Sequence, residues 1–278
     1  MRLSERLFQT IIRIIMIKYL VLGPAGMGLY AILGSLQHLQ DTNKLTQLEE
    51  ISGASAGALV GFMYCLYKGD MRQISDQALD MDIENKTKIN LYSLFKQYGF
   101  VDWVEIKKTL YELGEKKTGI KKLTMGELFN YSKIKLHIAT FSVTEGRTIY
   151  FSTDTHPSLE IVDIVCASMA VPFVFSAVQL QDNLYVDGGL EEVIPATPFL
   201  IKKNEHVKAI EVKMNKSTVV KDIMTFSKQI LYSLLKNRIT FVNVNTTRIN
   251  LEKYDVLDFK MKDITKMELY VRGYLADG

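Results

Sequence analysis

The chain has 278 residues, 47% of them hydrophobic, and a formal net charge of +3 at pH 7. This hydrophobic content is ordinary for a globular protein with a buried core, and so small a net charge gives no reason to expect a nucleic-acid partner. The length allows one large domain, and no Pro-, Gly- or Ser-rich linker divides it, so we expect a single domain over residues 16–278.

Residues 1–15 have the pattern of a short amphipathic helix, with leucines and isoleucines at helical spacing and arginines between them. This predicts an N-terminal extension that either covers the domain or docks on a membrane surface. No apolar run reaches the length of a membrane span, and Arg13 and Lys18 interrupt the stretch that comes nearest to a signal-peptide core. We therefore expect a cytoplasmic protein, with peripheral attachment to membranes as an option.

From residue 17 onward, the hydrophobic pattern predicts strands that alternate with helices. Such alternation favours a mostly parallel sheet that helices cover on both faces. The predicted elements are, in chain order, a strand over 17–22, a helix over 27–39, a strand over 48–51, a helix over 56–68, a mostly helical region over 71–130 with turns near Gly99, Gly114 and Gly119, strands over 134–140 and 148–151, a helix over 161–170, strands over 184–186 and 207–212, a long amphipathic helix through residues 223–235, a strand over 254–259 and a helix over 266–275.

Two residue types set expectations about the surroundings of the protein. Cys65 and Cys166 lie in apolar helical contexts, which indicates buried reduced thiols and a reducing compartment. Six lysines between residues 107 and 122 are typical of a solvated face, with weak attraction to anionic lipid headgroups as the alternative.

The most informative stretch is Gly53-Ala54-Ser55-Ala56-Gly57, a serine enclosed by four small residues between a predicted strand and a predicted helix. Gly53 and Gly57 permit a tight strand-to-helix turn, which would present Ser55 as a nucleophile. A serine hydroxyl is a poor nucleophile, however, unless a base takes its proton. The sequence must therefore supply a base.

Asp187 is a better candidate for that base than any of the four histidines. It ends an apolar strand, and Gly188 and Gly189 leave the space around its carboxylate open. Active sites of α/β folds lie at strand carboxyl ends, and a partly desolvated carboxylate can serve as the base. The four histidines, His38, His137, His156 and His206, lie in helix, strand or surface contexts that favour structural roles.

A glycine-rich turn between a predicted strand and a predicted helix offers backbone N–H groups to an oxyanion. It runs from Gly23 to Gly28, and the dipole of the helix that follows also favours an anion. Pro24 has no N–H to donate. The expected donors of an oxyanion hole are therefore Ala25, Gly26 and Met27.

Four ordered blocks of this sequence resemble the patatin-like phospholipases. The blocks cover residues 19–28, 53–58, 167–175 and 187–189, and the motif-bearing core spans about residues 17–200. A lone Gly-x-Ser-x-Gly is weakly specific, whereas four blocks in this order and at this spacing are highly specific.

The resemblance implies a three-layer α/β/α fold with a mostly parallel central sheet and a Ser–Asp dyad without histidine. It assigns Ser55 as the nucleophile and Asp187 as the general base, and it places the segment around Pro172 along the acyl groove. It implies hydrolysis of phospholipids or other acyl lipids, with no cofactor and no metal ion in the site.

The glycine-rich loop departs from the family pattern, which normally reads Gly-Gly-Gly-x-Arg-Gly. Here Pro24 and Ala25 replace two glycines, and Met27 replaces the frequent arginine. Loss of one oxyanion donor typically lowers the rate by about 10²–10³-fold.

Four other interpretations stay open. A histidine-assisted hydrolase would use His206, which follows Asp187 in the chain order Ser, Asp, His. A dinucleotide-binding site would use the Gly-x-Gly-x-x-Ala pattern of residues 26–31, with Glu49 and Glu50 about 20 residues further on. A lipid-binding protein without catalysis would keep the fold, and a transacylase would pass the acyl group to an alcohol instead of water.

Overall fold

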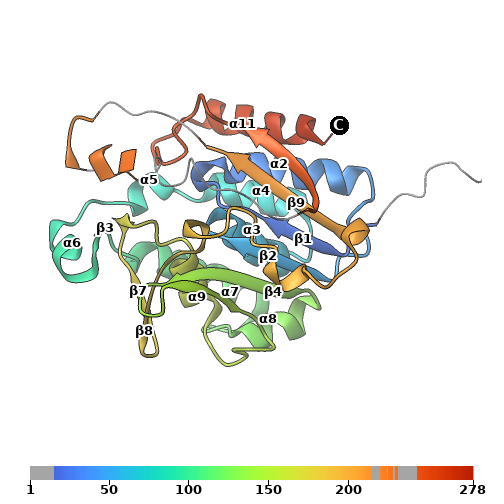
Figure 1. Ribbon diagram of the computed structural model, residues 1–278, viewed down its shortest axis with the longest axis horizontal. Helices are drawn as coiled ribbons and strands as arrows, with labels where there is room; N and C mark the ends of the chain where they lie inside the picture. Colours follow the sequence, from blue (N-terminus) through green and yellow to red (C-terminus); the bar gives the residue numbers. More distant parts are fainter. Residues whose placement is uncertain (1–15, 215–219, 224, 228, 231–242, 278) are drawn as a thin grey trace, which may run out of the picture.

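Strands and helices alternate along most of the chain, as the hydrophobic pattern predicts (Figure 1). The predicted N-terminal helix lies outside the described residues, and so do Leu231, Leu234 and Leu235 of the predicted long helix. The computed structural model describes residues 16–214, 220–223, 225–227, 229–230 and 243–277.

The centre of the fold is a mixed sheet in the order β10-β9-β1-β2-β4-β8-β7, with β5 also paired to β4. Neighbouring strands from β10 to β4 run parallel, whereas β5, β7 and β8 join through antiparallel pairs. The prediction of a mostly parallel sheet is thus confirmed. The strands are β1 (Tyr19–Leu22), β2 (Glu50–Ala54), β4 (Lys135–Ser142), β5 (Arg147–Phe151), β7 (Val178–Leu180), β8 (Asn183–Asp187), β9 (Val207–Lys213) and β10 (Asn245–Asn250), while β3 (Gly99–Val101) and β6 (Phe173–Phe175) form a separate parallel pair.

Helices flank the sheet and share its large core (Figure 1). They are α2 (Leu29–Asp41), α3 (Ala56–Leu66), α4 (Met71–Asp80), α5 (Ile83–Lys86), α6 (Leu91–Gln97), α7 (Val104–Thr118), α8 (Met125–Ser132), α9 (Ile161–Ser168) and α11 (Asp263–Ala276). Every residue of α3 is buried, as expected of a helix that is apolar on all sides.

Side chains on the two faces of β1 enter different clusters. Leu20 and Leu22 belong to the large helical core, whereas Val21 belongs to a small cluster with Ile194 and Phe199. This alternation is the period-two pattern of a strand that is buried on both faces.

The last strand lies earlier in the chain than the sequence predicts. Residues 254–259 form turns, and the strand is instead β10, which pairs with β9. The side chain of Asp255 accepts a hydrogen bond from the backbone N–H of Leu257 at 3.0 Å, and such local bonds compete with strand pairing. β10 alternates between exposed and buried residues, so it carries no continuous apolar run that would reveal it.

The region over residues 71–130 is mostly helical, as predicted, with two differences. Gly114 lies inside α7 rather than in a turn, and Gly99 begins β3. Gly119 does end α7, in the left-handed conformation that favours glycine.

A cluster of charged and polar side chains lies at the amino ends of the parallel strands. The carboxylate of Glu50 lies 2.8 Å from His137 Nε2 and 2.9 Å from Lys202 Nζ. Lys202 Nζ also lies 4.6 Å from the ring centre of Tyr19, which fastens the chain before β9 to the sheet. The hydrogen bond from His137, together with Lys202, lowers the pKa of Glu50 from 4.5 to about 2.

Replacement of Glu50 by glutamine is expected to lower the free energy of unfolding by about 1–3 kcal/mol, because Lys202 and His137 lose the carboxylate that they contact. The folded-state pKa of Glu50 is depressed, so its contribution is complete above 4.5 and is lost as the pH falls toward 2. Thermal midpoints measured at about pH 7 and about pH 3 should therefore show a smaller difference between wild type and Glu50→Gln at the lower pH.

Glu49→Gln is the matched control, because its carboxylate pairs with Lys18 at the solvent-exposed surface and is expected to contribute less than about 1 kcal/mol. A Glu50→Gln deficit that is equal at both pH values would contradict the role given to this carboxylate.

Candidate active site

Ser55 lies in a strained turn between β2 and α3. Its backbone has φ +54° and ψ −123°, a conformation that a residue with a side chain adopts only when its surroundings impose it. Among the described residues, the Ser55 side chain makes no capping hydrogen bond to α3. Its hydroxyl is therefore not used to cap the helix that follows it.

Gly57 lets α3 begin directly against the end of β1. A Cβ atom at this position would lie 2.2 Å from the carbonyl oxygen of Leu22, which is closer than real Cβ atoms come to any atom. At Gly53, a Cβ would lie 2.6 Å from the carbonyl oxygen of Gly57. The two glycines that flank Ser55 thus allow the close approach of helix and strands that forms the turn.

The Ser168 hydroxyl joins this turn to the neighbouring strand. Ser168 is the last residue of α9 and is fully buried. Its Oγ accepts a hydrogen bond from the backbone N–H of Ser55 at 2.9 Å and donates one to the carbonyl of Ala139 at 2.7 Å. The sequence places Ser168 in the third of the four blocks, residues 167–175, but does not reveal this bridge.

The strand register brings Asp187 level with Ser55. Ala54 pairs with Ala139 across the parallel ladder of β2 and β4. Thr140, the next residue of β4, pairs with Asp187 across the antiparallel ladder of β4 and β8. Only β4 therefore lies between Ser55 and Asp187, and at about 4.8 Å per strand the two backbones are on the order of 10 Å apart.

Asp187 is buried, with 5% of its surface exposed, and it ends β8. Its Oδ1 accepts a hydrogen bond from the backbone N–H of Gly189 at 2.7 Å. Its own backbone N–H donates to the carbonyl of Ala170 at 2.9 Å. Because Ala170 lies two residues after Ser168, one short segment at the end of α9 fixes the backbones of both Ser55 and Asp187.

The glycine-rich loop lies beside Asp187. A Cβ on Gly189 would lie 2.6 Å from the Cβ of Pro24, so the proline ring of this loop packs directly on the turn after β8. A Cβ on Gly188 would lie 2.0 Å from the carbonyl oxygen of Ala139. Both glycines after Asp187 are therefore required by close contacts with the parts of the chain that surround the site.

The loop supplies fewer N–H groups than the sequence suggests. The Met27 N–H donates to the carbonyl of Val256 at 2.7 Å, so it is already engaged, contrary to the expectation of a free donor. Among the described residues, no hydrogen bond engages the backbone N–H of Ala25 or Gly26. Gly26 has φ +52°, and a Cβ there would lie 2.4 Å from the Val256 carbonyl oxygen, so only glycine fits.

An apolar cavity adjoins Ser55 and holds about 670 Å³ of empty space, part of it open to solvent. Gly26, Ser55 and Ala56 all line it, so the glycine-rich loop and the start of α3 meet at its wall. Val171, next to Pro172, lines it as well. The cavity therefore joins the serine turn to the segment that the resemblance placed along an acyl groove.

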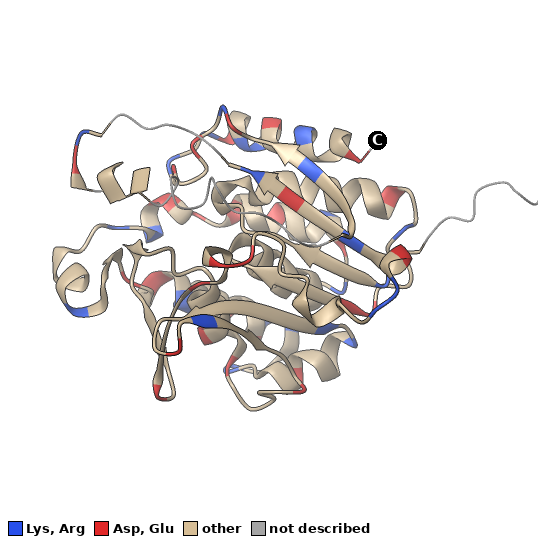
Figure 2. Ribbon diagram, in the orientation of Figure 1, with Lys and Arg blue, Asp and Glu red and all other residues tan. Residues whose placement is uncertain are grey.

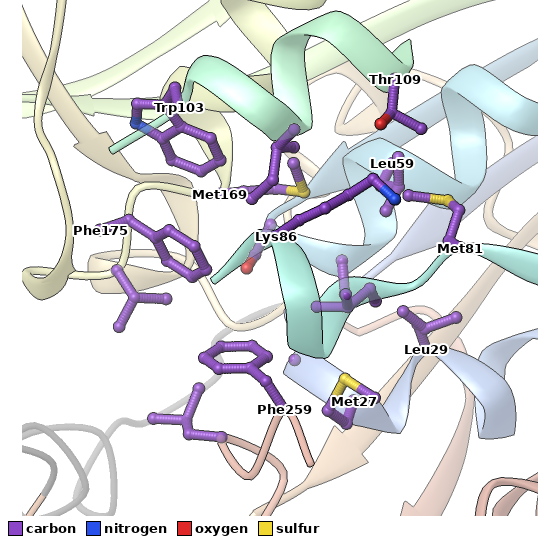
Figure 3. A pocket seen from close by; sticks show the side chains of 17 residues that line it. Met27, Leu29, Leu59, Met81, Lys86, Trp103, Thr109, Met169, Phe175 and Phe259 are labelled. Atoms are coloured by element: carbon purple, nitrogen blue, oxygen red, sulfur yellow. The ribbon is translucent and has the colours of Figure 1, made fainter. Parts of the chain in front are cut away.

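Large apolar side chains from distant parts of the sequence make the remaining wall. In Figure 3, Trp103, Phe175 and Phe259 line one side of the space, and Leu29 and Met81 line the other. Trp103 and Met81 come from the region over residues 71–130, for which the sequence offered no role. This region forms a wall of the cavity.

All four histidines lie near the amino ends of the parallel strands, whereas Ser55 lies at their carboxyl ends. His206 immediately precedes β9, at the amino ends of the parallel strands, and His137 belongs to the charged cluster there. His156 follows β5. It lies near the amino end of β4, because Asp154, two residues before it, pairs with the first residue of β4. His38 lies in the last turn of α2, which returns to this edge. The histidine-assisted hydrolase is therefore wrong, because His206 lies at the other end of the strands from Ser55.

The dinucleotide-binding interpretation also fails. It needs an acidic residue beside the glycine-rich loop, at the carboxyl ends of the strands. Glu50 instead begins β2 and belongs to the charged cluster, and Glu49 pairs with Lys18 at 2.6 Å. Both carboxylates lie at the wrong edge of the sheet.

Other features bear on cofactors and surroundings. Among the described residues, no group of three or more His, Cys, Asp or Glu side chains is placed to hold a metal ion. Cys65 and Cys166 are buried free thiols, as predicted, and burial raises the pKa of Cys65 to about 12. Of the helices in the described part, none has the length and apolar character needed to cross a membrane.

Two viral proteins are similar to this chain in sequence. The probable lipid hydrolase 463L of Invertebrate iridescent virus 6 is 25% identical over 274 residues, which cover 92% of this chain and 86% of that protein. The uncharacterized protein R571 of Acanthamoeba polyphaga mimivirus is 27% identical over 188 residues, which cover 66% of this chain and 61% of R571.

Two solved structures share the fold. VipD from Legionella pneumophila superposes with a TM-score of 0.66 at 18% identity, over 94% of this chain and 66% of VipD. ExoU from Pseudomonas aeruginosa, solved in complex with SpcU, gives a TM-score of 0.55 at 16% identity, over 94% of this chain and 51% of ExoU. The chain thus spans only about half to two thirds of these two proteins.

A family model described as patatin-like phospholipase matches residues 20–200, more than half of the chain. The matched region includes the glycine-rich loop, the serine turn, the end of α9 and the turn after β8. The chain therefore belongs to the patatin-like phospholipase family.

Proposed function

We propose that this chain is a lipid acyl hydrolase of the phospholipase A type, with Ser55 as nucleophile and Asp187 as general base. The position of Ser55 carries the proposal: it occupies a strained turn on the wall of an apolar cavity, level with a buried carboxylate. Because the four histidines lie near the far edge of the sheet, Asp187 is the base that the geometry favours.

In the acylation step, Ser55 Oγ attacks the ester carbonyl carbon while its proton passes to the Asp187 carboxylate. The tetrahedral oxyanion accepts hydrogen bonds from the backbone N–H groups of Ala25 and Gly26, and from that of Ala56 at the start of α3. Asp187 then returns the proton to the leaving oxygen. A lysolipid departs, and the acyl group stays esterified to Ser55.

In the deacylation step, water attacks the acyl-enzyme while Asp187 takes one of its protons. The second tetrahedral intermediate collapses, the Ser55 oxygen leaves and regains the proton from Asp187, and a fatty acid is released. If an alcohol takes the place of water, the same steps make the protein a transacylase. Neither route needs a metal ion or a cofactor.

A lipid-binding protein without catalysis is the second candidate. The observation in its favour is the glycine-rich loop, where Pro24 has no N–H and the Met27 N–H is engaged by Val256. For either candidate we propose a phospholipid or related acyl lipid as the ligand, reached from a membrane surface by a cytoplasmic protein that attaches peripherally.

Ser55→Ala and Asp187→Asn should each lower the hydrolysis of phospholipid vesicles by roughly 10⁴-fold or more, because each removes one half of the dyad. His206→Ala is the control and should keep full turnover. Release of fatty acid, measured by mass spectrometry, reports the activity. A fluorophosphonate probe should label Ser55 in the wild type and in His206→Ala, and it should not label Ser55→Ala. Undiminished hydrolysis by Ser55→Ala would refute the dyad, and an unlabelled, folded wild type would favour the non-catalytic candidate.

Gly26→Ala should lower kcat on a soluble short-chain ester by about 10²–10³-fold, because a Cβ against the Val256 carbonyl displaces an oxyanion donor. Gly114→Ala is the matched control: it lies inside α7, where an added Cβ meets nothing within 4 Å, and should leave kcat unchanged. Equal kcat values for Gly26→Ala and wild type, with both proteins folded by circular dichroism, would exclude this loop from the oxyanion hole.

Ile106→Trp should shorten the acyl chain that the enzyme prefers, because Ile106 lines the cavity from α7 and a larger side chain fills the space for the chain. The value of kcat/KM for the palmitate ester should fall by about tenfold or more relative to the butyrate ester. Ile106→Val serves as the control and should keep the wild-type profile. A palmitate-to-butyrate ratio that stays the same in Ile106→Trp would place the acyl chain elsewhere.

A further inference from the structure

Helix α6 has its apolar side chains on the outside. Its one buried residue is Ser93, whereas Tyr92 and Phe95 are 70% and 80% exposed. Contiguous exposed apolar side chains mark interaction sites in otherwise polar surfaces. We call this the α6 surface, and it consists of Ile89, Leu91, Tyr92, Phe95, Tyr98 and Val104, all of them exposed.

The α6 surface is continuous with the wall of the cavity. Lys86 lines the cavity and also a surface groove formed with Leu91 and Tyr92. Trp103 lines the cavity and also a second groove, which contains Tyr98. The exposed apolar residues therefore border the space beside Ser55.

The chain segment that carries α6 has only positively charged side chains, whereas Asp102 and Glu105 line the grooves next to it. Residues 86–101 contain Lys86, Lys88 and Lys96 and no aspartate or glutamate (Figure 2). Within the described part of the chain, none of these three lysines forms an ion pair. The carboxylate of Asp102, the next residue along, is engaged by the backbone N–H of Val104.

The lysines that the sequence singled out behave differently. Lys107 pairs with Asp163 at 2.6 Å, and Lys122 pairs with Glu160 at 2.9 Å. These pairs tie α7 and the chain after it to α9. Lys86, Lys88 and Lys96, by contrast, form no ion pair in the described part of the chain and lie in the same segment as the exposed aromatic side chains of α6.

We propose that the α6 surface docks on the headgroup region of a bilayer that contains anionic phospholipids. Tyr92 and Phe95 insert at the interface, where an apolar body with a polar tip is favoured, and Lys88 and Lys96 face the headgroup phosphates. This orientation turns the cavity toward the membrane, so an acyl chain enters it without crossing water. The inference rests on the proposed function, since it assigns the surface from which the lipid reaches Ser55.

The first test measures the partition of the full chain between buffer and vesicles of phosphatidylcholine with or without phosphatidylserine. Lys88→Glu/Lys96→Glu should lower binding to the anionic vesicles by at least about 25-fold, at roughly fivefold for each lysine removed, and should change binding to the neutral vesicles little. High salt should weaken binding of the wild type and narrow this difference.

Tyr92→Ser/Phe95→Ser should lower binding to both kinds of vesicle by about tenfold or more, because it removes inserted apolar area. Lys116→Glu/Lys121→Glu is the matched charge control, since both lysines are exposed and neither lines the cavity or the two grooves beside α6. Ile264→Ser/Val271→Ser on α11 is the matched apolar control, with both residues exposed. Both controls should bind as the wild type does.

Hydrolysis of a soluble short-chain ester separates this inference from the proposed function. Both α6 variants should hydrolyse that ester at the wild-type rate, which also shows that they are folded, and should lose activity on vesicles alone. If the wild type does not hydrolyse the ester, the hydrolase proposal fails and the vesicle partition still decides the docking surface.

Three results would overturn the docking proposal: a wild type that does not bind anionic vesicles, α6 variants that bind them as the wild type does, or controls that lose as much binding as the α6 variants. Light scattering identifies a competing occupant. A wild-type dimer that Tyr92→Ser/Phe95→Ser converts to a monomer, with vesicle binding unchanged, would assign the α6 surface to a second copy of the chain.

Discussion

One buried hydroxyl group holds the candidate site in place. The Ser168 hydroxyl accepts a hydrogen bond from the backbone N–H of Ser55 and donates one to the carbonyl of Ala139. It therefore links the strained turn to β4, the strand that lies between Ser55 and Asp187. A strained backbone persists only where its surroundings over-determine it, and a buried N–H or C=O without a partner would cost about 1–3 kcal/mol. The turn, β4 and the end of α9 thus depend on one another, and the cavity is built around them.

The two edges of the parallel strands have different tasks. At the amino ends, the carboxylate of Glu50 contacts both His137 and Lys202, and these contacts link β2, β4 and the chain before β9. At the carboxyl ends, glycines without a Cβ let the chain segments approach closely, so that Ser55, Asp187 and the loop at Gly26 lie near one another. The histidines serve structure at one edge, and the chemistry that we propose at the other edge uses serine, aspartate and backbone N–H groups alone.

The helical region over residues 71–130 connects the cavity to the surface. Its α5 and α7 helices contribute wall residues, and α6 between them exposes aromatic side chains beside unpaired lysines. An apolar cavity requires a route by which an apolar ligand arrives, and a surface that borders the cavity with apolar and cationic groups suits a lipid headgroup layer. The same segment therefore shapes both the binding space and its approach.

The sequence by itself determined the strand–helix alternation, the serine turn, the aspartate turn and the glycine-rich loop, because each depends on local constraints: period-two burial in strands, and glycine where the backbone turns sharply or approaches another segment. Only the tertiary structure decided that Val256 engages the Met27 N–H, that Ser168 bridges Ser55 to β4, that β10 is an edge strand and that the apolar residues of α6 face outward. The physical reason is that hydrogen-bond partners and burial arise between segments far apart in the chain, where sheet register and helix packing select the contact and no local pattern records it.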